Sequence, residues 1–366
     1  MVNQKKKQLI SVDKYCQSFQ KKDSNKLPTI GITMGDPAGI GPEIAVKALK
    51  HKSIYKICKP LVIGDSSVLA NAAYFLKSKI KIKSIKNIDD AKFSFGTMDV
   101  YDLNNVDIKK LKLGKVSAMA GNAAFESVKT AIQLALDKKI DAVVTGPIHK
   151  EALNLAGHNY TGHTEIFGFY TKTKNYAMLL VEGEMRVIHV TTHISLREAC
   201  DLIKKKRVFE VIKLADEACR KLGIKSPRIG VAGLNPHASD GGLFGMEEQK
   251  EIIPAIKAAR KIGINVEGPY AGDTIFPKLK GGSYDIVVAM YHDQGHIPLK
   301  LFGFKWGEKK QKWDSVSGVN ITAGLPIIRV SVDHGTAFDQ AGKGTASEKS
   351  LLDAIFYAVA LSMNSN

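Results

Sequence analysis

Three histidines stand at the ends of apolar segments, where their imidazoles could take part in chemistry. His193 lies in VIHVTTHISL, His237 in IGVAGLNPHASDGG and His292 in YDIVVAMYHDQGHIPLK. A strand that ends in a polar residue delivers that side chain to the carboxyl edge of a sheet, where open α/β folds build their sites. Three imidazoles around one point are most simply explained by a divalent metal with an open coordination position. We therefore predict one metal site built from distant parts of the sequence.

The alternative for each histidine is an ordinary role on the surface or in the core. The chain has ten histidines, and most histidines in proteins ligate nothing. The prediction depends on the strand-end context that these three share. Three nitrogen ligands favour zinc, cobalt, nickel or manganese over magnesium, with zinc first, although oxygen donors from a substrate could still make magnesium workable.

The elements that must position these residues alternate between strand and helix. Residues 27–34, 58–65 and 140–148 have the composition of buried strands, and 122–139 has the apolar spacing of an amphipathic helix. This alternation predicts an α/β fold with a mostly parallel sheet flanked by helices. Residues 176–194 instead read as a hairpin turning at Gly183 and Glu184, which predicts a mixed sheet.

Length and composition are those of an ordinary globular protein. The 366 residues suffice for two domains, with 44% apolar and 24% charged residues. The four cysteines are scattered and form no motif, which indicates reduced thiols in a cytoplasmic protein. No apolar run reaches the roughly 20 residues of a membrane span, so we expect no membrane association.

The net charge of +17 raises the possibility of nucleic-acid binding. Residues 1–26 form a basic arm with seven lysines against two aspartates, and the remaining lysines are spread over the predicted helix faces. Without an RNA-binding signature or an aromatic-rich basic face, we expect no nucleic-acid partner. A positive field would also attract an anionic small substrate toward a cleft.

Six segments carry a resemblance to a known family. TMGDPAGIGPE, GHTE, THISL, NPHASDGG, MYHDQGH and NITAGLPIIRVSVDHGTAFDQAG follow one another in this order. Together they resemble the 4-hydroxythreonine-4-phosphate dehydrogenases of pyridoxal phosphate biosynthesis, over roughly residues 27–366. The resemblance implies a two-domain α/β fold related to isocitrate and isopropylmalate dehydrogenases, and a homodimer. We expect a cofactor-side domain at 27–125 plus 296–366 and a metal and substrate domain with the dimer interface at 126–295.

The resemblance also implies roles for particular residues. The metal would be held by His193, His237 and His292, at a site shared between the two subunits. The substrate residues would be His163, Thr164, Lys300, Asn320 and Arg329. The segment DHGTAFDQAG is similar to a cofactor-binding loop of isopropylmalate dehydrogenases and points to His334, Gly335, Thr336 and Asp339. The cofactor would be NAD or NADP, and the GxGxxG fingerprint that could help to choose between them is absent.

The activity implied is the metal-dependent oxidation of 4-phosphohydroxy-L-threonine, followed by decarboxylation to 3-amino-2-oxopropyl phosphate. Lys300 and Arg329 are candidates for binding phosphate or carboxylate, and a surface salt bridge is the ordinary alternative. His163 could bind phosphate or move a proton. Asp293, beside His292, could fix the tautomer of that imidazole or could face solvent. We regard His163, Lys300 and Asp293 as the catalytic candidates.

Three other functions and two departures from the family remain. A sister dehydrogenase acting on 4-phospho-threonate or erythronate would use the same chemistry, a phosphate acyltransferase would need neither nicotinamide nor the histidines, and a nucleic-acid binder would rest on charge alone.

The arm at 1–26 precedes the usual start of the family. Residues 302–318 are longer than the usual connection, and either a surface insertion or a lid fits their composition.

Overall fold

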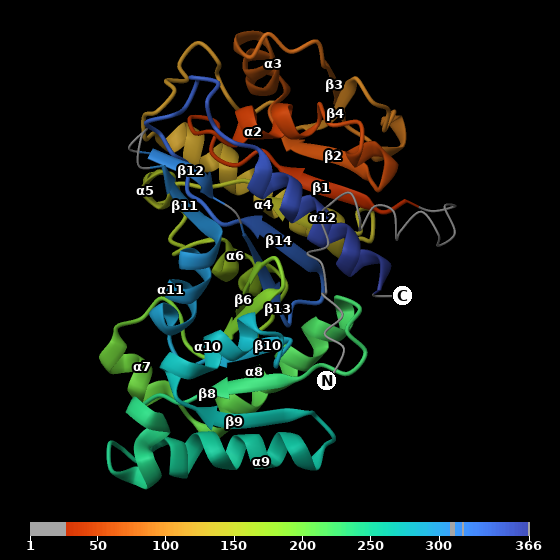
Figure 1. Cartoon of the computed structure of the whole chain (residues 1–366). Helices are drawn as coiled ribbons and strands as arrows, with labels where there is room; N and C mark the ends of the chain where they lie inside the picture. Colours follow the sequence, from red (N-terminus) through yellow and green to blue (C-terminus); the bar gives the residue numbers. More distant parts are fainter. Residues whose placement is uncertain (1–26, 308–311, 317, 365–366) are drawn as a thin grey trace.

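The computed structural model describes residues 27–307, 312–316 and 318–364, so the basic arm lies outside the described residues. A sheet of 12 strands runs through this part of the chain, in the order β3-β4-β2-β1-β5-β14-β13-β6-β7-β10-β8-β9. Figure 1 shows the sheet from β3 at the top to β9 near the bottom, with α9 beneath it. The strands are β1 Thr29–Thr33, β2 Lys59–Gly64, β3 Lys81–Ile85, β4 Thr97–Asp102, β5 Ala142–Thr145, β6 Ala177–Glu182, β7 Met185–His189, β8 Ile229–Ala232, β9 Val266–Tyr270, β10 Ile286–Ala289, β13 Val319–Ala323 and β14 Ile328–Val332.

Most neighbouring strands are parallel, which confirms the predicted α/β class. The exceptions lie in the middle, where β13 is antiparallel to both β14 and β6, and β6 is antiparallel to β7. The predicted hairpin is β6 and β7, and Gly183 takes a positive φ of 57° in the turn between them. Since β14 pairs with β5, the last strands of the chain join its two halves.

Helices cover both faces of the sheet. One long apolar core lies under α2, α3, α12, α8 and α9, and the opposite face has one core under α4 and α6 and another under α10 and α11. The helices are α2 Gly41–Ala48, α3 Ser66–Phe75, α4 Ala118–Leu136, α5 Lys150–Leu155, α6 His163–Tyr170, α7 Leu196–Leu202, α8 Lys205–Lys221, α9 Ile253–Lys261, α10 Gly272–Lys280, α11 His292–Gly303 and α12 Lys349–Met363. None of the helices among the described residues is long and apolar enough to cross a membrane.

The expected domain boundaries fall inside helices. The boundary at 125/126 lies within α4 and the one at 295/296 within α11, while the sheet continues from one half of the molecule to the other. Colours in Figure 1 show the path: the chain builds the upper half, passes to the lower half and returns to the middle. The division into two domains therefore stays a prediction.

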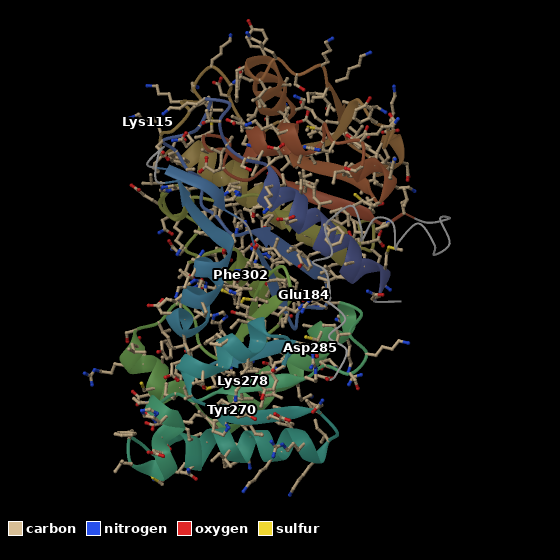
Figure 2. The ribbon with its side chains drawn as sticks, viewed as in Figure 1. Lys115, Glu184, Tyr270, Lys278, Asp285 and Phe302 are labelled. Atoms are coloured by element: carbon tan, nitrogen blue, oxygen red, sulfur yellow. The ribbon has the colours of Figure 1, made fainter. Side chains whose placement is uncertain are left out.

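The long connection at 302–318 includes regular structure among its described residues. It contains β11 (Phe304–Gly307) and β12 (Lys312–Val316), which pair antiparallel in a small separate sheet. Phe302, at the end of α11, lies between the two halves of the molecule in Figure 2, with Lys280 Nζ 5.2 Å from its ring centroid. This contact fixes α11 against α10, and α11 carries part of the site described next.

Candidate active site

A cavity of about 950 Å³ opens along the middle of the sheet. Its walls come from the ends of β5 and β14, from β13, from the start of α6 and from the segment that follows β7. The parallel strands β5 and β14 end at the edge where the antiparallel β13 begins, so segments that are far apart in sequence meet there. Of the predicted site residues, the cavity brings together His163, Thr164, His193, Asn320, Arg329 and His334.

Arg329, on β14, is the deepest cation of this cavity and is only 3% exposed. Its Nη1 donates to Thr322 Oγ1 at 2.9 Å and its Nη2 to Thr145 Oγ1 at 3.1 Å, while its Nε has no partner among the described residues. Burial lowers the pKa of the guanidinium to about 9, so the group keeps its charge at neutral pH. A buried, incompletely satisfied cation favours an anionic ligand.

His163 and Asn320 also present unsatisfied polar atoms. His163 is the first residue of α6, and neither its Nε2 nor Asn320 Oδ1 has a hydrogen-bond partner in the described part of the chain. Burial lowers the pKa of His163 well below 6.5, and the charge of Arg329 lowers it further. A hydrogen bond with the Gly146 backbone opposes this shift. His163 is therefore neutral at pH 7 and can accept or donate one hydrogen bond at Nε2.

Lys300 reaches this site through a neighbour. The residue lies on α11, and its Nζ donates to Asp333 Oδ2 at 3.0 Å. Asp333 lines the cavity, whereas Lys300 does not. The ion pair fixes the start of the segment that follows β14 and leaves Lys300 two further donors.

The structure brings together two of the three histidines predicted to hold metal. The ring centroids of His193 and His292 are 5.8 Å apart, and both residues line a second cavity of about 670 Å³. His292 Nδ1 lies 2.6 Å from Asp293 Oδ1, which leaves Nε2 for another partner. When two imidazoles each place a nitrogen about 2 Å from the same ion, their ring centres are separated by a distance similar to that between His193 and His292. The pair therefore fits a shared divalent ion with Asp293 orienting one ligand.

His237 is not part of this pair within the chain. It follows β8, in a segment where His237, Ala238, Ser239 and Asp240 all have positive φ, and it lines a different cavity with Ile297 and Leu301. Among the described residues, no three histidine, cysteine or acidic side chains are grouped so that they could hold a metal ion. The described residues of the chain thus supply two of the expected ligands at one point and place the third in another cavity.

The predicted cofactor loop packs against the turn that follows β1. The Ile40 backbone N–H donates to Thr336 O at 3.0 Å, and a side chain at Gly39 would place its Cβ 2.9 Å from the same oxygen. Glycine at this position allows the two loops to touch. His334 lines the main cavity, whereas Gly335, Thr336 and Asp339 do not. Burial lowers the pKa of His334, so this imidazole is neutral at pH 7.

Sequence reasoning missed two histidines and one aspartate near this site. His296 lines the main cavity and stacks on His292, with ring centroids 3.6 Å apart, and His189 lies behind it. The signal was present, because HVTTH and HDQGH each place two histidines four residues apart. Asp36, in the turn after β1, is completely buried with Oδ2 unpartnered, and burial raises its pKa to about 6.

The fold and this site define a class. An α/β sheet that holds a buried cation in a cavity beside paired imidazoles suits an enzyme that binds a small anionic substrate, and the comparisons with known proteins specify which kind. Residues 56–358 match the family described as pyridoxal phosphate biosynthetic protein PdxA. The chain belongs to this family and is an oxidoreductase of the dehydrogenase type.

Individual relatives are similar over nearly their whole length. The D-threonate 4-phosphate dehydrogenase of Cupriavidus necator is 49% identical over 333 residues, which cover 91% of this chain and 96% of the relative. A putative D-threonate 4-phosphate dehydrogenase of Oceanobacillus iheyensis is 49% identical over 339 residues, covering 92% and 98%. The crystal structure of 4-hydroxythreonine-4-phosphate dehydrogenase from Klebsiella pneumoniae superposes with a TM-score of 0.81 at 44% identity, covering 93% of this chain and 99% of that one.

Proposed function

We propose that this chain oxidises D-threonate 4-phosphate with NAD or NADP and releases carbon dioxide. The observation that carries the proposal is Arg329, a buried guanidinium with an unpartnered Nε that lines the cavity beside His163 and Asn320. Oxidation of the hydroxyl at C3 gives a β-keto acid, and loss of its carboxylate leaves dihydroxyacetone phosphate. The nicotinamide takes the hydride, and His334, Gly335, Thr336 and Asp339 remain our candidates for binding the cofactor.

The charge of the cavity favours the sugar acid over the amino acid. The two candidate substrates differ at C2, where 4-phosphohydroxy-L-threonine has an ammonium and D-threonate 4-phosphate a hydroxyl. Among the described residues, three carboxylates line the cavity: Glu165, which accepts from Thr161, Asp333, which accepts from Lys300, and Glu210. The cations that line the cavity are more numerous: Lys150, Lys174, Lys204, Lys206, Arg207 and Arg329. Such a field favours the substrate without the extra positive charge.

The second candidate is 4-phosphohydroxy-L-threonine, which the sequence motifs alone favoured. Its support is the group of solved structures titled 4-hydroxythreonine-4-phosphate dehydrogenase, at 44–46% identity. The names of the curated relatives, at 46–49% identity, support D-threonate 4-phosphate instead. Both substrates present phosphate and carboxylate to the same cations, so the choice between them depends on contacts at C2.

In the proposed reaction, individual residues of this chain would have separate roles. Arg329 binds one anionic group of the substrate inside the cavity, and its hydrogen bonds to two threonines hold the guanidinium in place. Lys300, which does not line the cavity, remains our candidate for the other anionic group through the donors left by its ion pair with Asp333. His163, which is neutral at pH 7, accepts a proton or hydrogen bond at Nε2. Asn320 orients a hydroxyl through Oδ1. A divalent ion held by imidazoles, zinc or cobalt in preference to magnesium, would supply Lewis acidity toward the hydroxyl to be oxidised.

A homodimer would complete the metal site. Around His237 the surface is apolar and exposed, with Leu243 at 74%, Ile297 at 64% and Leu301 at 83% exposure. His237 shares a cavity with Ile297 and Leu301, and its ring centroid lies 6.2 Å from that of Phe244. A second copy of the chain would cover this surface and could bring its His237 to the His193 and His292 pair. The apolar exposure supports this assembly because monomers rarely leave such a group of side chains in water.

The test measures the rate at which reduced nicotinamide forms with each substrate and each cofactor. We expect kcat/KM for D-threonate 4-phosphate to exceed that for 4-phosphohydroxy-L-threonine by at least about tenfold, which corresponds to about 1.4 kcal/mol. The reverse preference would support the second candidate. The absence of nicotinamide reduction with either substrate, in protein supplied with zinc or cobalt, would exclude both.

A further inference from the structure

Four histidine rings form a continuous row at the end of β7 and the start of α11. His193 and His292 have ring centroids 5.8 Å apart, His292 and His296 3.6 Å, and His296 and His189 4.8 Å. The tightest contact is the stack of His292 on His296, whose ring planes are only 14° apart. Because the two residues are four apart in α11, their side chains lie on the same face of the helix.

His296 is held from both sides. Its Nδ1 lies 2.9 Å from the His292 carbonyl oxygen, and since a carbonyl can only accept, this nitrogen carries the proton. Behind it lies His189, whose side chain is fully buried and whose Nδ1 donates to Met178 O at 3.2 Å. Gly295, the residue before His296, packs closely against His189: a Cβ at this position would lie 2.2 Å from His189 Nε2. The row is therefore tightly packed, and His296 has little freedom to turn.

We propose that His296 is a positioning residue, whose stacked ring holds the imidazole of His292 in the orientation that binds the metal. Asp293 fixes His292 at Nδ1 in the plane of the ring, and His296 fixes it from the face. Together, a hydrogen bond at Nδ1 and a stacked ring on the face restrict both the tilt and the rotation of the His292 ring. Partners that orient a ligand in this way commonly contribute 10–100-fold to metal affinity, an order of magnitude set by known metal sites. The inference rests on the proposed role of His292 as a ligand.

The experiment compares two substitutions of His296 in the full-length protein. His296→Phe keeps an aromatic face against His292, whereas His296→Leu removes it and keeps a similar volume. The dissociation constant for Co²⁺ is measured by competition with a chromophoric chelator, and the visible spectrum of bound Co²⁺ reports the ligand geometry. We expect about a tenfold weaker constant and an altered spectrum for the leucine variant, and a constant within about threefold of the original for the phenylalanine variant.

A matched control is available elsewhere in the chain. His158 stacks on Phe125 with centroids 3.7 Å apart and planes 14° apart, and it does not line the cavity. His158→Leu should leave Co²⁺ affinity unchanged. Original affinity in His296→Leu, or an equal loss in the leucine and phenylalanine variants, would overturn the inference. The proposed function is tested separately by His292→Ala: if the original chain binds Co²⁺ no better than this variant, it is the metal site that fails.

Discussion

Arg329 and Thr145 lie on neighbouring parallel strands, and the Nη2 of Arg329 donates to the Thr145 hydroxyl at 3.1 Å. A second threonine, Thr322 on β13, accepts from Nη1, so the guanidinium is held by both strands that flank β14. This arrangement prepares a fixed, water-poor cation before any ligand arrives. The cavity lies where the parallel and antiparallel parts of the sheet meet.

Arg329→Lys should preserve the charge and lose the fixed geometry. A lysine cannot reach both threonines and a ligand with planar donors, so we expect kcat/KM to fall by at least about 100-fold, or about 2.7 kcal/mol. Steady-state assays with D-threonate 4-phosphate measure the effect. Arg260→Lys, on α9 with Nε bonded to Val266 O, is the control and should remain active. Full activity of Arg329→Lys would show that the guanidinium does not bind the substrate.

Removal of the metal should abolish turnover. We expect protein treated with a chelator and checked by elemental analysis to lose activity, and zinc or cobalt to restore it, because His193 and His292 present imidazole nitrogens rather than oxygens. Full turnover by the metal-free protein would contradict the metal-dependent chemistry while leaving the substrate assignment open to the assay described above.

The alternation of strands and helices predicted the fold, and the motifs shared with the family predicted many of the residues of the site. His163, Asn320 and Arg329 belong to three such motifs, and the cavity brings them together. The position of His237 could not be predicted in this way. Its segment turns through six consecutive residues with positive φ, 237–242, and carries the side chain toward another cavity. Periodicity identifies strands but does not determine where an irregular turn aims its side chains.

A charge introduced on the apolar surface around His237 should dissociate the proposed dimer. Leu301 on α11 is 83% exposed, and a glutamate there would have to be buried without a partner in the assembly. We expect Leu301→Glu to sediment as a monomer and to bind Co²⁺ more weakly, since His237 of the second copy would be lost. Tyr74→Glu on α3, at a site that is 84% exposed, is the control. A monomeric original chain with full metal affinity would refute the shared site.

Asp353 on α12 should make stability depend on pH in a predictable direction. Burial raises its pKa to about 6, with Lys349 opposing the shift and Glu182 adding to it. Since the unfolded chain releases this proton near pH 4, the folded state loses stability between about pH 4 and 6 and carries the full cost above that range. We expect Asp353→Asn to raise the melting temperature by a few degrees at pH 8 and to have little effect at pH 4. A pH-independent difference would contradict this assignment.

Gly295 should tolerate no side chain, because α11 packs closely against the end of β7 at this residue. A Cβ at this position would lie 2.2 Å from His189 Nε2 and 2.8 Å from Val187 Cγ1, and both neighbours are fully buried. Overpacking of this kind typically costs about 1–3 kcal/mol and moves the backbone. We expect Gly295→Ala to lower the free energy of unfolding by that amount, measured by urea denaturation, and to weaken Co²⁺ binding because His292 and His296 begin the same helix. Gly162→Ala, where no atom lies within 4 Å of the added Cβ, should leave unfolding nearly unchanged. If both variants unfolded at the original urea concentration, the close packing of α11 on β7 would be wrong.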